Sequence, residues 1–157
     1  FSMLSERQLN YLLNDKLNQK LPPFINLGKL GLNLGLQGMQ FTATSTVAEN
    51  QTLSYPMYLH SISNNNDNQD IVSMGCNAAL MTRKVIDNSF DVLAVQTLAL
   101  AQAMDYLKYH SRMSSFSHKF FDEVRSIVPA IIEDKPRYKD VQEIRKYLIR
   151  LGASAPL

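Results

Sequence analysis

Seven consecutive residues, Asn64 to Asp70, carry side chains that end in an amide or a carboxylate, and a long apolar segment follows them. Asparagine and aspartate often occupy turns and helix caps, because their side chains satisfy backbone groups that lack a partner. Asp70 or Ser73 is therefore predicted to cap the helix that follows. From the pattern alone, capping is preferred over a ligand site, but it accounts for only one or two of the polar residues.

The other amides have a spacing that could bind a ligand. At a helix start, Asn65 and Gln69 would be four residues apart and would face the same side. The first turn of a helix carries unpaired N–H groups and the positive end of the helix dipole. Two amides there would favour a carboxylate or another polar ligand, which makes this segment the leading candidate for a site.

The histidines give no comparable signal. His60, His110 and His118 are scattered, with none of the spacings of zinc sites. They are interpreted as surface or packing residues, and no metal site is predicted.

Composition narrows the class of protein. The net charge is +2, from 16 basic and 14 acidic residues spread along the chain, so there is no basic stripe that would bind nucleic acid. A single cysteine, Cys76, excludes an internal disulfide and fits a reducing cytosol. Polar residues interrupt the longest apolar stretch, which therefore reads as a buried helix and not as a membrane span. We expect a cytoplasmic protein.

Apolar residues recur at helical spacing almost throughout, and no strand pattern of any length occurs, so the class is all-α. The predicted helices cover residues 2–20, 36–53, 71–110, 116–132 and 139–150. At ~1.5 Å per residue the third would extend roughly 55 to 60 Å, too long for a compact domain of 157 residues. We therefore expect a bundle shared with other subunits or with further chain. The uncapped opening of the first helix also indicates a piece of a longer protein.

Three segments stand out in order along the chain: GLQGMQFTATSTVAENQTLSYP (35–56), SISNNNDNQDIVSMGCNAAL (61–80) and VLAVQTLALAQAMDYL (92–107). Together they resemble the aromatic amino acid ammonia-lyases, most closely the bacterial tyrosine ammonia-lyases. The resemblance implies a homotetramer of long helices and the elimination of ammonia from an aromatic amino acid, leaving an α,β-unsaturated acid. It also implies that residues 1–110 form a central bundle segment with an active-site wall, and residues 111–157 a C-terminal helical region.

The electrophile of that family is a methylidene-imidazolone made from an Ala-Ser-Gly triplet, and this sequence contains no such triplet. Ala153-Ser154-Ala155 does not replace it, because ring closure uses the glycine nitrogen and a compressed backbone. The resemblance therefore implies a C-terminal part of the enzyme, with the cofactor formed by sequence that precedes it. Such a part would be inactive alone.

The resemblance also assigns roles to residues. Gln69 matches the position that carries Glu in histidine lyases and Gln in phenylalanine and tyrosine lyases, near the substrate's amino group and the electrophile, which implies a catalytic role. Asn65 and Asn68 match positions that line the same pocket. Gln37 and Phe41 match positions that contact the ring side of the substrate. The polar run would then be one wall of an active site.

The choice of Gln over Glu favours tyrosine or phenylalanine as substrate, because a carboxylate could form an ion pair with an imidazole or accept its proton, whereas the neutral amide has no charge. Three alternatives stay open. The protein could be a histidine ammonia-lyase, an aminomutase with the same scaffold, or a helical scaffold without catalysis.

Overall fold

The computed structural model describes residues 1–59 and 61–154. Its α-helices are α1 (Ser2–Leu13), α2 (Asp15–Asn18), α3 (Gln37–Leu53), α4 (Gly75–Leu107), α5 (Ser115–Ile127) and α6 (Tyr138–Ser154). No β-strand occurs within the described ranges, where only two isolated bridges form. The all-α prediction is confirmed. Among the described helices, none combines the length and the apolar character needed to cross a lipid bilayer.

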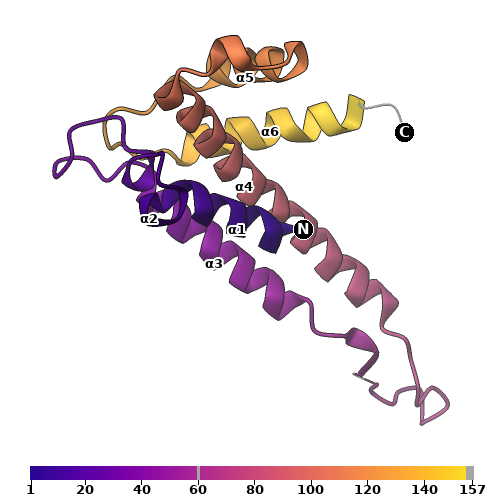
Figure 1. Ribbon diagram of the computed structural model, residues 1–157. Coiled ribbons are helices and arrows are strands. Elements are labelled where there is room, and N and C mark those ends of the chain that lie inside the picture. The colour runs from indigo at the N-terminus through magenta and orange to yellow at the C-terminus, as the bar shows by residue number, and fades with distance from the viewer. Residues whose placement is uncertain (60, 155–157) are drawn as a thin grey trace.

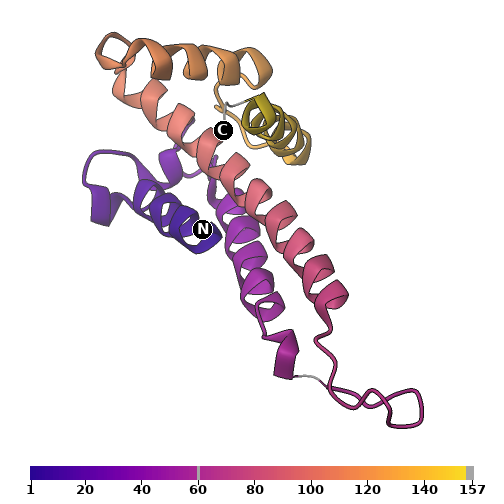
Figure 2. The ribbon, with the colours of Figure 1, turned by 90° about the vertical axis from the view of Figure 1, so that its right-hand side faces the viewer.

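The long helix α4 is the axis of the molecule. Figures 1 and 2 show α3 running beside α4 in the opposite direction, with α1 crossing the pair and α5 at the C-terminal end of α4. Helix α6 packs across the middle of α4, where Arg145 contacts Asp87 and Asp91. Residues 61–74, which precede α4, form a loop that projects beyond the helices (Figure 1). The loop that carries Asn65, Asn68 and Gln69 therefore extends away from the main core.

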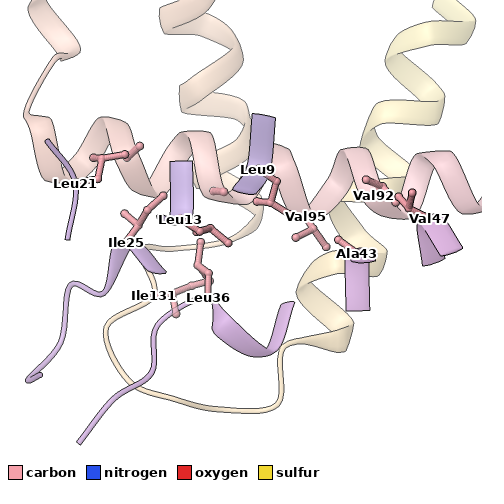
Figure 3. Packing of buried hydrophobic residues seen from close by; sticks show 12 residues of the cluster. Leu9, Leu13, Leu21, Ile25, Leu36, Ala43, Val47, Val92, Val95 and Ile131 are labelled. Carbon is pink, nitrogen blue, oxygen red and sulfur yellow. The ribbon is translucent and has the colours of Figure 1, made fainter. Parts of the chain in front are cut away.

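One face of α4 forms the main core with α1 and α3. The apolar residues recur at three- and four-residue intervals, so they line one stripe of each helix. Full burial of each leucine, isoleucine or valine side chain contributes about 1.5–3 kcal/mol. Figure 3 shows the cluster, which includes Leu9, Leu13, Leu36, Ala43, Val47, Val92, Val95, Ala99 and Ile131.

A second face of α4 packs against α5 and α6. The buried residues of this cluster are Ala94, Leu98, Ala101, Phe121, Val124, Val128 and Ile144. Both clusters therefore include residues of α4, and its C-terminal half is buried on more than one side.

The first predicted helix, 2–20, is interrupted at Asn14. This residue leaves the helical conformation (φ −100°, ψ 99°), ends α1 and caps α2, because its side-chain oxygen accepts from the N–H groups of Lys16 and Leu17. The prediction missed the break because Asn competes for local backbone groups without disturbing the apolar spacing.

The third predicted helix, 71–110, is shorter at both ends. The 33 residues of α4 extend about 50 Å. Neither Asp70 nor Ser73 caps it, because the N-cap position is Met74, in a left-handed conformation with no side-chain cap. The predicted 116–132 helix ends at Ile127, since Pro129 disfavours helical backbone in the residue before it. The 36–53 helix is confirmed to within one residue.

Candidate active site

The polar run forms a tight hairpin loop and not a helix start. The backbones of Asn64 and Gln69 pair in both directions, with N···O distances of 3.0 and 3.3 Å. The Asn68 N–H donates to the carbonyl of Asn65 at 3.2 Å, closing the turn between them. At the base of the loop, the Ser61 hydroxyl donates to the Asp70 carbonyl at 2.7 Å. The predicted placement of Asn65 and Gln69 on one helix face is therefore wrong.

The loop backbone explains much of its composition. Asn65, Asn66 and Asp67 all have positive φ, at 54°, 53° and 61°. Asn and Asp tolerate this left-handed region better than other non-glycine residues, because their short polar side chains bond locally. The Ser63 hydroxyl, for example, donates to the Asp67 carboxylate. Part of the polar run is thus required by the turn itself.

Three candidate residues remain together on this loop. Asn65, Asn68 and Gln69 are all exposed, and the hairpin holds them within five residues of chain. No lysine, arginine, histidine or cysteine occurs in residues 61–74. Besides two carboxylates and three hydroxyls, the loop therefore presents neutral amides, which donate and accept hydrogen bonds, and it carries no amine, imidazole or thiol that would compete with a substrate amine.

The other two candidates lie elsewhere. Gln37 is half-buried in the first turn of α3, and Phe41, one turn later, is 68% exposed. The loop begins beyond the opposite end of this 17-residue helix, and α3 alone extends about 24 Å. Figures 1 and 2 place the loop and the start of α3 at opposite ends of the helix pair. Within one chain, the five candidates do not meet.

A cavity that the sequence did not predict lies near Gln37 and Phe41. It has a volume of about 540 Å³ and lies between α3, α4, α6 and the segment before α6. Its walls are mostly apolar, and the polar residues among them include Asp91, Asp134, Lys135 and Arg137. Burial raises the pKa of the Asp91 carboxyl group. The positive charge of Arg145, whose Nε lies 3.2 Å from the carboxylate, acts in the opposite direction and is the smaller effect. No periodic pattern indicates such a cavity, because it forms where three helices and a connecting segment meet.

Within residues 1–59 and 61–154, no group of three histidine, cysteine or carboxylate side chains is arranged to hold a metal ion. His110 and His118 lie with ring centroids 6.4 Å apart, and His110 packs edge-on against Phe121. His118 also contacts the Asp122 carboxylate at 2.9 Å. His60 and Ala155 fall outside the described residues.

A sequence model of the family described as aromatic amino acid lyase matches residues 1–126. The chain belongs to this family. The resemblance noted from the three segments is confirmed.

Named relatives of this lyase-family chain have different activities. It is 37% identical to the tyrosine ammonia-lyase of Cupriavidus metallidurans, over 96% of this chain and 28% of the relative. It is 38% identical to the histidine ammonia-lyase of Staphylococcus saprophyticus, over 92% of this chain and 29% of the relative. The crystal structure of tyrosine aminomutase from Streptomyces globisporus superposes with a TM-score of 0.91, at 38% identity, over 95% of this chain and 28% of that one.

The chain thus spans somewhat more than a quarter of the length of the relatives it matches. The chain is about equally identical to lyases named for two different substrates and to an aminomutase. These similarities identify the family, but they do not distinguish between the substrates.

Proposed function

We propose that this chain is the C-terminal part of an aromatic amino acid ammonia-lyase that acts on tyrosine or phenylalanine and releases an α,β-unsaturated acid. The observation that carries the proposal is Gln69, an exposed neutral amide on a tightly bonded loop in a chain of the aromatic amino acid lyase family. In histidine lyases the resemblance places Glu at this position, so Gln favours an uncharged aromatic ring.

The loop residues bind and orient the substrate in this proposal. The Gln69 amide accepts from the substrate's amino group or donates to its carboxylate, and Asn65 and Asn68 supply further donors and acceptors. The methylidene-imidazolone, formed from a triplet outside this chain, supplies the electrophile. A loop without basic or thiol side chains fits a position beside such a group, because it carries no amine, imidazole or thiol that would add to the electrophile.

The site is shared between copies of the protein. The length of α3 separates Gln37 and Phe41 from Gln69 within one chain, so a second copy packed in the opposite direction is needed to bring the two groups together. This supports the homotetramer that the resemblance implies. Residues 1–110 would then carry the active-site walls, and residues 111–157 would form the C-terminal helical region.

The deciding experiment is a product assay on the full-length natural protein, with tyrosine, phenylalanine and histidine offered separately. Coumarate or cinnamate is expected as the main product. Urocanate would overturn the choice of substrate. A β-amino acid would favour an aminomutase, and the absence of every product would favour a non-catalytic scaffold.

The variant Gln69→Ala tests the role of the loop. It should lower the turnover of the full-length enzyme at least tenfold, because a polar contact to the reacting substrate is lost. The thermal midpoint should change little, because Gln69 is exposed and its loop bonds are made by its backbone. The matched control is Asn77→Ala, an exposed amide on the first turns of α4. Equal turnover in the Gln69 variant and the control would remove the proposed role.

A further inference from the structure

A pair of buried asparagines lies between α3 and α4. Asn50 and Asn88 are each 4% exposed, and the Asn88 Nδ2 donates to the Asn50 Oδ1 at 2.9 Å and to the Glu49 carboxylate at 2.7 Å. The Asn50 Nδ2 in turn donates to the hydroxyl of Ser2 at 3.1 Å. This asparagine pair is therefore satisfied on several sides and links α1, α3 and α4.

The asparagine pair occupies the same stripe as the apolar core. On α3 the buried residues are Ala43, Val47 and Asn50, spaced by four and three. On α4 the facing stripe continues from the core valines to Asn88. The pair is thus the last fully buried layer on the side of the 61–74 loop.

Packing beyond that layer is looser. A cavity of about 260 Å³ lies between the end of α3 and α4, lined on the α4 side by Ala78, Met81, Thr82 and Val85. Among residues 51–57, 59 and 61–87, whose burial the structure describes, none is buried. Within this chain, few apolar side chains beyond the asparagine pair are therefore enclosed between α3 and α4.

We propose that Asn50 and Asn88 are positioning residues, which fix the axial register of α3 against α4 and so place the loop that carries Gln69. The apolar layers cannot do this alone, because Ala43 and Val47 would meet similar side chains after a shift of one turn, about 5.4 Å. After the same shift each asparagine would face an apolar side chain and lose its partner. A buried amide at one seam position is a known way to specify register.

The inference about the loop rests on the proposed function, but the register can be measured without activity. In the full-length protein, spin labels would be attached to the exposed Cys76 on α4 and to Thr52→Cys on α3, with other cysteines replaced. Labelled subunits would be diluted with unlabelled ones, and the distance distribution would be measured by pulsed electron resonance. The parent protein should give one narrow distance.

The test variant is Asn50→Leu/Asn88→Leu, which removes both amides together and leaves no unpaired partner between them. The distance distribution should broaden or shift by about 5 Å, one helical turn. Turnover should fall at least tenfold, while the thermal midpoint stays near that of the parent. If the leucine pair does not fold, Asn50→Ala/Asn88→Ala removes the same amides without added volume.

The matched control is Gln96→Leu. Gln96 is also a buried amide on α4, but it donates to Gln8 on α1 and has no bond to α3. It should keep the single narrow distance. A narrow, unshifted distance in the asparagine variants would overturn the proposal, and so would a changed distance with full turnover. If the parent enzyme has no activity, the proposed function fails, and the distances still decide whether the pair fixes the register.

Discussion

Replacing Gln102 should free the segment that leads from α5 to α6. Gln102 is completely buried on α4, and its side-chain amide pairs with both backbone groups of Ile131: the Ile131 N–H donates to its Oε1 at 3.1 Å, and its Nε2 donates to the Ile131 carbonyl. The substitution Gln102→Leu removes the acceptor of the Ile131 N–H and the donor to the Ile131 carbonyl, with little change in side-chain volume. Each buried polar group left unpaired costs roughly 1–3 kcal/mol. Partial access of water lowers the sum for two groups to about 2–4 kcal/mol.

Amide hydrogen exchange in the full-length protein measures this loss directly. Since 1.4 kcal/mol corresponds to a factor of ten, the Ile131 amide should exchange about 30 to 1,000 times faster in the variant. Gln102→Glu should have a smaller effect, because it keeps the acceptor for the Ile131 N–H. Gln142→Leu, at an exposed position of α6, is the control. A change below about threefold at Ile131 would refute the reasoning that the pairing holds this segment.

Two further predictions concern pH and charge. Burial and the hydrogen bond to Glu123 raise the pKa of Tyr147 to about 12. The parent should therefore be more stable than Tyr147→Phe below pH 10 and should lose this advantage as the pH rises through about 12. Thermal midpoints of the two proteins across this pH range would measure the difference. Arg145 contacts the carboxylates of Asp87 and Asp91 at 2.8 and 3.2 Å. Arg145→Met should cost about 1 kcal/mol at pH 7. It should also raise the pKa of Asp91 further, so the deficit should shrink as the pH falls through that pKa, because protonation removes the unpaired charge.

The helices were predictable where apolar spacing and chain breakers agree. The 36–53 prediction matches α3 because the glycine-containing segment precedes it and Pro56 follows it. The breaks at Asn14 and Met74 were not predictable in the same way. At Asn14 a side chain replaces backbone bonds of the helix, and at Met74 a residue adopts a left-handed conformation without being glycine. Neither change alters the period of the apolar residues.

The polar run shows why candidate residues are easier to find than their geometry. Its composition marks residues 64–70 as unusual, and the family resemblance gives Gln69 a role. The hairpin, however, depends on backbone pairing between Asn64 and Gln69 and on three consecutive positive φ values, and amide side chains are compatible with both a helix cap and this turn. Composition could not distinguish the two structures.

The separation of Gln37 from Gln69 has a consequence for the whole protein. A helix has a fixed rise, so no side-chain rearrangement can close the distance of about 24 Å that α3 imposes. If both residues contact one substrate, they must come from different copies, and the register of α3 against α4 must be the same in each copy. An error of one helical turn in either would move the loop by more than the length of a hydrogen bond. Because such a site requires a rigid helix pair, a change at the buried asparagines should also affect the substrate contacts of the exposed loop.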